Sequence, residues 1–207
     1  MSLSILRTIV ALAVAWLTVG CALTEDKVPI DYVSQVAAPA PTPGAEDVLV
    51  TLNAQDRRVQ LADRVSTKKN GYGMEMARIV STNNVVDLVR TSVEREFTAQ
   101  GFRVGSGGVP VTIELQNFYN NFEVGLVTGT ASADVSFGLR VRDAAGAQLY
   151  ARNYSGSGRI DDVMLMSGDN AKAALQKALS AAVKQVADDT ALQQALLSTR
   201  TRRIRGS

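Results

Sequence analysis

The feature that most constrains the fold is an alternation of apolar and polar residues over residues 131–142. Apolar side chains stand at Ala131, Ala133, Val135, Phe137, Leu139 and Val141, and the residues between them are Ser132, Asp134, Ser136, Gly138, Arg140 and Arg142. Successive side chains of a β-strand point to opposite faces of the sheet. Six consecutive matches therefore predict a long strand with one buried face and one face in water, as is typical of antiparallel sheets.

The neighbouring segments predict an antiparallel meander around this strand. Residues 109–116 alternate in the same way, and a turn at residues 143–146 leads to a tyrosine-bearing run at residues 148–157. Closer to the start, residues 48–52 are rich in β-formers, and Asn70-Gly71 predicts a two-residue hairpin turn with a strand on each side.

Two longer segments have the spacing of amphipathic helices. Val85, Val89, Val93 and Phe97 share one helical face, Asn83 or Asn84 can cap the start of that helix, and Gly101 suits its end. A second stripe consists of Ala171, Leu175, Ala178, Leu179, Ala182 and Val186, with Asp169 or Ser167 as its cap. Residues 188–190 are expected to interrupt that helix, and a short helix through Leu192 and Leu196 follows.

The helices must bury their stripes, and the apolar face of the sheet is the available partner. We therefore expect an α+β fold, with an antiparallel sheet of about four to five strands and two or three helices packed on one face. This domain should span residues 46–198, followed by a basic C-terminal tail, 199–207, which carries Arg200, Arg202, Arg203 and Arg205 and is expected to be frayed and solvated.

The chain begins with a different kind of segment. Arg7 precedes 16 uncharged residues, 8–23, which is shorter than the roughly 20 apolar residues that cross a bilayer. A basic start, an apolar stretch and then small residues are typical of a secretory signal peptide. We expect residues 1–20 to be this signal and residues 21–45, with four of the five prolines, to form an extended tether that holds the domain away from the lipid surface.

Leu17-Thr18-Val19-Gly20-Cys21 resembles the lipobox of bacterial lipoprotein precursors, although the usual leucine three places before the cysteine is Thr18 here. The resemblance implies a lipid on the sulfur of Cys21, the only cysteine in the chain, and cleavage just before it. Cys21 could instead be a chance thiol beside an ordinary cleavage site, or the segment could stay as an uncleaved anchor. Ala22 is not the aspartate that commonly retains lipoproteins in the inner membrane, which favours the outer membrane.

Composition excludes several classes of function. The chain of 207 residues has no histidine, which excludes Ser-His-Asp and Cys-His catalysis and His-ligated zinc. The formal net charge is only +2, so a nucleic-acid partner is not expected. We expect no cofactor, no metal and no small-molecule substrate.

Several elements together resemble the YajG family of bacterial lipoproteins. They are the lipobox-like Cys21, the proline-bearing tether, the helix ending at residues 98–105, the strand at 111–115, the alternating strand at 131–141 and the closing alanine-rich helix. The resemblance implies an outer-membrane-anchored periplasmic domain with no catalytic residues to carry over.

Three motifs could carry chemistry. Ser66 and Lys69 match the Ser-x-x-Lys spacing of penicillin-binding enzymes, but the Lys-Thr-Gly motif of those enzymes is missing, so a polar turn is the alternative. Glycine clusters at residues 105–108 and 156–158 could bind phosphate but are expected to be turns. The acidic pairs Asp161-Asp162 and Asp188-Asp189 lack calcium-loop spacing, and helix capping and solvation explain them.

Two apolar segments are candidate contact sites. One, residues 118–127, is expected to be a loop between two strands and carries Phe118, Tyr119 and Phe122; the other precedes the long helix and carries Met164 and Met166. Exposed apolar or methionine-rich patches often contact partners. The alternative is that these residues extend strands or cover the core.

Three functions follow from these observations. The leading hypothesis is a non-catalytic lipoprotein, anchored through Cys21 and facing the periplasm, that binds an envelope protein or itself through a sheet edge or loop. The second is an accessory component of envelope transport or lipid handling, which requires a continuous apolar groove. The third is a peptidoglycan enzyme acting through Ser66 and Lys69.

Overall fold

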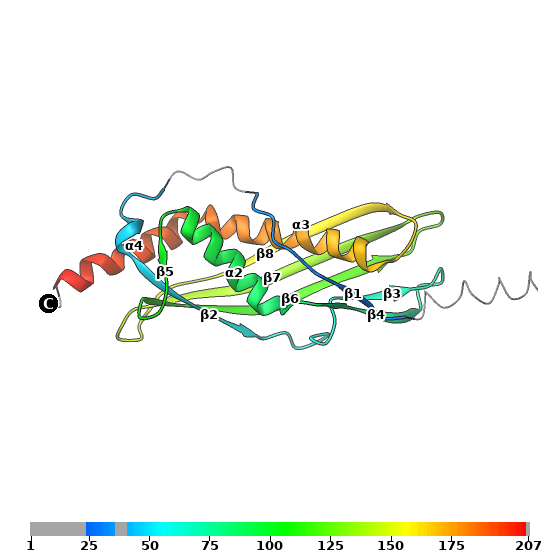
Figure 1. Cartoon of the computed structure of the whole chain (residues 1–207), viewed down its shortest axis with the longest axis horizontal. Coiled ribbons are helices and arrows are strands. Elements are labelled where there is room, and N and C mark those ends of the chain that lie inside the picture. Colours follow the sequence, from blue (N-terminus) through cyan, green and yellow to red (C-terminus); the bar gives the residue numbers. More distant parts are fainter. Residues whose placement is uncertain (1–23, 36–40, 206–207) are drawn as a thin grey trace, which may run out of the picture.

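The computed structural model describes residues 24–35 and 41–205, with side chains up to residue 200 (Figure 1). The strands are β1 (Asp26–Val28), β2 (Leu49–Asp56), β3 (Ser66–Lys69), β4 (Glu75–Ser81), β5 (Arg103–Val104), β6 (Val109–Glu123), β7 (Gly129–Arg142) and β8 (Gln148–Val163). The helices are the 3-10 turn η2 (Ala45–Asp47) and the α-helices α2 (Val85–Ala99), α3 (Gly168–Ala187) and α4 (Thr190–Arg205).

Within these residues, eight strands form one mixed sheet, so the expected four to five antiparallel strands were too few. The predicted meander is present, because β7 lies antiparallel between β6 and β8. The other edge of β6 is shared: β2 lies parallel to its first half, and β3 meets it at Asn120. Beyond these, β5 pairs in parallel with β2, β4 pairs antiparallel with β3, and β1 pairs in parallel with β4.

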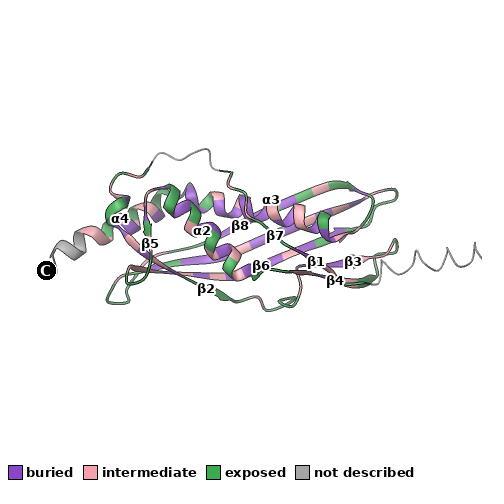
Figure 2. Ribbon diagram, in the orientation of Figure 1, coloured by how far each residue is buried: buried purple, intermediate pink, exposed green. Residues whose placement is uncertain are grey.

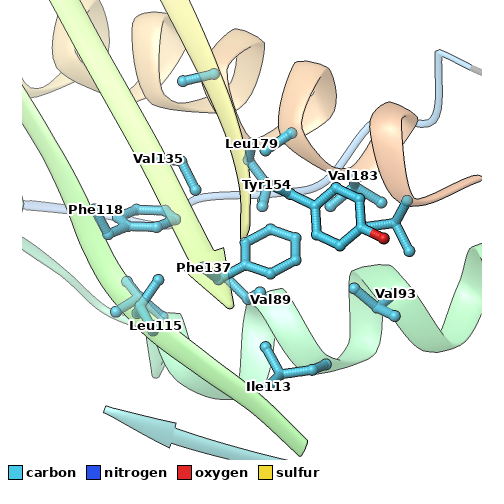
Figure 3. Close-up of a cluster of buried hydrophobic side chains, with 14 of the residues drawn as sticks. Val89, Val93, Ile113, Leu115, Phe118, Val135, Phe137, Tyr154, Leu179 and Val183 are labelled. Atoms are coloured by element: carbon cyan, nitrogen blue, oxygen red, sulfur yellow. The ribbon is translucent and has the colours of Figure 1, made fainter. Parts of the chain in front are cut away.

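The α-helices lie over one face of the sheet (Figure 1). Every residue of the predicted stripe on α3 is fully buried, and so are Val89 and Val93 of α2. These side chains meet the apolar face of the sheet, where Phe137 and Tyr154 have ring centroids 5.8 Å apart (Figure 3). The other face of the sheet remains polar, as the alternation predicted, and the fold is the expected α+β arrangement with helices on one face.

Both predicted helix boundaries have their expected chemistry. The side chain of Asn84 accepts hydrogen bonds from the amides of Val86 and Asp87 at the start of α2. Gly101, just after that helix, has a φ of 94°, which only glycine adopts without strain. Ser167 is the cap of α3, and α4 extends to Arg205, well beyond the short helix expected.

Strand β6 is longer than the sequence indicated. A register shift between Leu115 and Asn117 moves the apolar positions from odd to even numbers. Phe118 and Phe122 therefore point into the core, and each is only 1% exposed. The expectation that they lie in a loop was wrong, and the turn between β6 and β7 is confined to residues 124–128.

Two glycines let α3 approach the sheet closely. A Cβ on Gly158 would lie 2.1 Å from the carbonyl oxygen of Ala174, and one on Gly156 would lie 2.2 Å from that of Ala178. Gly156 and Gly158 lie inside β8, so the expectation that residues 156–158 form a turn was wrong. Glycine is required here because backbone packs against backbone.

The segment expected to be a free tether is largely part of the domain. Residues 26–28 form β1, and Val28 and Ile30 are buried in the core. Further along, Ala45 is fully buried and the amide of Thr42 donates to the carbonyl of Gln100. Figure 2 shows how buried and exposed residues are distributed over the helices and strands.

The two remaining local expectations also differ from the structure. The turn between β3 and β4 is longer than two residues: the Asn70 amide donates to the Met74 carbonyl, and the positive φ of 80° is at Gly73. Residues 199–205 of the C-terminal tail are helical rather than frayed, and Arg200 pairs with Asp47 at 3.0 Å.

Candidate functional site

The described chain begins at Thr24, three residues after Cys21, which itself lies outside the described residues. The Nζ of Lys68 donates to the Thr24 carbonyl at 3.0 Å and pairs with the Asp26 carboxylate at 2.7 Å. The same carboxylate accepts a hydrogen bond from the Gly168 amide at 2.8 Å. Burial opposes ionisation of Asp26, but these bonds outweigh it and lower its pKa. The start of the described chain is thus fixed to β3 and to the first turn of α3.

Three connections end beside this point. They are the β3–β4 turn, the β6–β7 turn and the loop between β8 and α3, all at the same end of the elongated domain as β1 begins (Figure 1). Lys69, next to Lys68, donates to the Phe122 carbonyl at 3.0 Å and so ties the first turn to the second. We call this the Thr24 end of the domain.

The Thr24 end exposes a set of apolar side chains, which we call the apolar tips. They are Tyr72 and Met74 in the first turn, Val124, Leu126 and Val127 in the second, and Met164 and Leu165 in the third. Leu126 is 106% exposed and Met164 81%. Of the 11 large hydrophobic residues exposed in the described chain, these seven lie at one end. Exposed apolar patches of this kind are typical of contact surfaces, which makes the apolar tips the candidate site.

The five residues predicted as contact candidates separate into different groups. Phe118 and Phe122 are core residues, as the alternative stated, and cannot reach a partner in this fold. Tyr119 is half-buried, and its hydroxyl lies 3.0 Å from that of Thr67. Met166 packs partly against the core, whereas Met164 is an apolar tip.

Four of the remaining apolar tips lay within the two apolar segments already considered, but Tyr72 and Met74 were missed. The sequence signal for that pair was present: two large apolar residues directly follow the Asn70-Gly71 turn, where polar residues are usual.

Ser66 and Lys69 do not form a nucleophile and base. The Ser66 hydroxyl is fully buried, donates to the Asn120 carbonyl at 2.8 Å and accepts from the Asn120 side chain at 2.9 Å. Lys69 binds the Asn121 side chain at 2.7 Å instead. These bonds join β3 to β6.

Asp189 has the most unusual environment among the acidic candidates. Its carboxylate caps α4 by accepting from the amides of Ala191 and Leu192, and it also accepts from Tyr150 at 2.5 Å, Tyr154 at 2.9 Å and Arg152 at 2.8 Å. Burial alone would raise its pKa, but these hydrogen bonds outweigh burial and lower the pKa to about 2. The expected capping role is confirmed, but solvation is not, because the side chain is 3% exposed.

The long edge strand β8 is covered by side chains of α3. Lys177 donates to the Arg159 carbonyl at 3.1 Å, and Gln185 donates to the Ser155 carbonyl at 2.5 Å. Capped carbonyls cannot pair with an added strand, so this edge is protected against strand addition along its middle.

A hollow of about 600 Å³ lies at the opposite end of the domain. It is lined by residues 107–110 before and within β6, by residues 142–146 between β7 and β8, and by Thr199 of α4. Val109, Pro110, Ala144 and Ala145 make the lining mostly apolar, although Arg142 and Asp143 also line it.

Two features are absent from the described residues, 24–35 and 41–205. No described helix combines the length and the hydropathy that crossing a membrane requires. No three acidic or cysteine side chains gather there as metal ligands.

Comparison with known proteins gave one family and several similar structures. Residues 34–197 match the model of a family described as uncharacterized lipoprotein. A solved protein of Xanthomonas campestris, of family DUF330, is 13% identical with a TM-score of 0.56 over 87% of this chain and 99% of that one, which shows a shared fold.

Two lipoprotein structures are also similar to this chain. A minor lipoprotein of Acinetobacter baumannii is 8% identical, with a TM-score of 0.43 over 70% of this chain and 92% of that one. A putative lipoprotein of Caulobacter crescentus is 13% identical, with a TM-score of 0.43 over 73% of this chain and 93% of that one. No curated protein matches the chain.

Proposed function

Since the chain belongs to the uncharacterized lipoprotein family, the YajG-type family that its sequence resembles, we propose that it is a non-catalytic accessory module of the cell envelope. In this proposal a lipid on Cys21 anchors it in the periplasmic leaflet of the outer membrane. The folded domain then faces the periplasm and contacts an envelope protein or a second copy of itself.

The observation that carries the proposal is the fixed position of Thr24. Lys68 and Asp26 hold this residue at one end of the domain, three residues after Cys21. An anchor at Cys21 would therefore orient the whole body from that end and direct the uncovered polar face of the sheet sideways, where a partner can reach it. The hypothesis of a peptidoglycan enzyme acting through Ser66 loses support, because the Ser66 hydroxyl is buried and bonded to Asn120.

The anchor is tested by growth with radiolabelled palmitate. The wild type is expected to carry label and Cys21→Ser to lack it, because the thioether sulfur is then absent. Mass spectrometry should find a mature chain that starts at an acylated Cys21. An intact leader, or label retained by Cys21→Ser, would contradict the proposal.

Partner contact is tested by placing a photo-reactive side chain at Ser136, on the uncovered face of the sheet, or at Met164 in the apolar tips. Irradiation of cells should give one defined protein adduct, and an adduct between two copies would indicate self-association. Absence of any adduct at both positions would contradict an interaction role.

Treatment with a labelled β-lactam is expected to leave Ser66 unmodified, and covalent labelling would instead support the enzyme hypothesis.

A second function is favoured by the hollow at the far end. An accessory component of lipid handling needs an apolar cavity, and this hollow has about 600 Å³ and an apolar lining. Mass spectrometry of lipids bound to the purified protein tests this function. Ala145→Asp, which adds a second carboxylate to the lining beside Asp143, should remove bound lipid, whereas an unchanged lipid content would contradict this function.

A further inference from the structure

We propose that the apolar tips insert into the interfacial layer of the same bilayer that holds the lipid of Cys21, so that the domain stands end-on upon the membrane. This inference rests on the lipid anchor proposed above. It replaces the expected spacer with a direct contact between the folded domain and the membrane.

The first step of the argument is the reach of the chain. A fully extended chain spans at most about 3.6 Å per residue, so three residues separate Thr24 from Cys21 by no more than about 11 Å. Thr24 cannot swing away, because its carbonyl is held by Lys68 and its neighbour Asp26 is held by Lys68 and by the Gly168 amide. A lipid on Cys21 therefore keeps the Thr24 end at the membrane surface.

The second step is the composition of that end. Three connections distant in the sequence, at residues 70–74, 124–128 and 164–167, converge there and expose large apolar side chains. Leu126 and Val127 are 106% and 86% exposed, and Met164 and Leu165 are 81% and 71% exposed. Tyr72, at 92%, is a residue type that favours the boundary between lipid and water. These side chains project at the one place where the chain's own anchor brings hydrocarbon within reach.

The third step is the charge around the apolar tips. Glu123 directly precedes Val124, and Asp161 and Asp162 precede Met164, so carboxylates flank two of the three connections. The nearby cations also have partners: Arg159 pairs with Asp161 and Lys68 with Asp26, both at 2.7 Å. Lys69 donates to the Asn121 side chain and the Phe122 carbonyl. Among its described residues, the Thr24 end therefore does not present a patch of unpaired cations that would bind anionic headgroups. The contact should depend on apolar insertion and should be insensitive to salt.

The test uses the lipidated full-length protein reconstituted in phosphatidylcholine vesicles. Cys21 is the only native cysteine, and its sulfur is blocked when acylated, so Leu126→Cys introduces one reactive thiol for an environment-sensitive fluorophore. Gln194→Cys, exposed on α4 at the opposite end of the domain and outside the lining of the hollow described above, is the matched control. Quenching by lipids brominated along their acyl chains then reports depth at each position.

We expect quenching and a shift to shorter emission wavelength at position 126, neither at position 194, and no change in 0.5 M salt. Adding Leu165→Glu to Leu126→Cys should reduce the quenching without unfolding the domain, because Leu165 is exposed. Equal lack of quenching at both positions, in protein that floats with the vesicles, would overturn the inference while leaving the anchor intact. The photo-reactive side chain used above can also be placed at position 126. A protein adduct there, together with a lack of lipid quenching, would overturn the inference in favour of a protein partner. Failure to float, with Cys21 open to the fluorophore, would overturn the anchor and this inference together.

Discussion

Replacing Asp189 with Asn removes a buried negative charge that three side chains and two backbone amides stabilise. The pKa of Asp189 is about 2 in the folded protein, against an ordinary value of 3.8. A difference of about 1.8 in pKa corresponds to about 2.4 kcal/mol of folding free energy at pH 7. For a domain of this size, the loss should lower the melting temperature by about 5 to 10 °C.

The pH dependence distinguishes this charge effect from any change in packing. Because the folded pKa lies below the unfolded one, the stabilisation is fully present above pH 3.8 and is lost as the pH falls through 2. At pH 3 about 1.3 kcal/mol remains, so the difference between wild type and Asp189→Asn should shrink by about 1.1 kcal/mol between pH 7 and pH 3.

Urea denaturation at both pH values measures this difference. Asp188→Asn is the matched control. The Asp188 carboxylate pairs with Lys184 on the surface, so this variant should stay within about 0.5 kcal/mol of wild type. A difference for Asp189→Asn that is the same at both pH values would refute the assignment of a lowered pKa.

Two further substitutions test the packing. Gly158→Ala should destabilise the domain by about 1 to 3 kcal/mol, because the added methyl meets the backbone of α3, whereas Gly71→Ala, with open space around it, should be near neutral in the same thermal melt. Phe122→Ala should cost about 3 to 5 kcal/mol in urea denaturation, against less than about 0.5 kcal/mol for Val127→Ala; comparable small losses for both would place Phe122 outside the core.

The local elements were largely predictable because their signals lie within short windows. The alternation around Val135 predicted β7, and Asn84, Gly101 and Ser167 mark helix boundaries through bonds or dihedral angles that depend on near neighbours. The coarse fold class followed, because amphipathic helices need an apolar sheet face to cover.

The pairing of strands distant in the sequence could not be predicted in the same way. The bulge after Leu115 breaks the alternation, so Phe118 and Phe122 no longer match the pattern of the preceding strand. Gly156 and Gly158 were interpreted as a turn because their role depends on a helix that comes later in the chain. They leave room for the backbone of α3, which packs directly against β8. β1 was missed because three residues beside Pro29 carry little strand signal.

Some residues of the candidate site could likewise be found from the sequence, and others could not. Met164 was recognisable because it stands in an apolar run before a helix, but the convergence of three connections at Thr24 depends on the sheet topology. Asp189 was assigned to capping correctly, yet its burial depends on Tyr150 and Tyr154, which reach it from β8.

The short pairing of β1 determines how the protein responds to mechanical force. With the proposed lipid on Cys21, a pull on that lipid would enter the sheet through three residue pairs between β1 and β4 and through the carboxylate of Asp26. These contacts are few compared with the long ladders of β6, β7 and β8, so β1 would peel away first. Residues 24–28 would then supply at most about 18 Å of slack, because Ile30 stays bonded to the Asn83 side chain, and the rest of the domain would stay folded under tension.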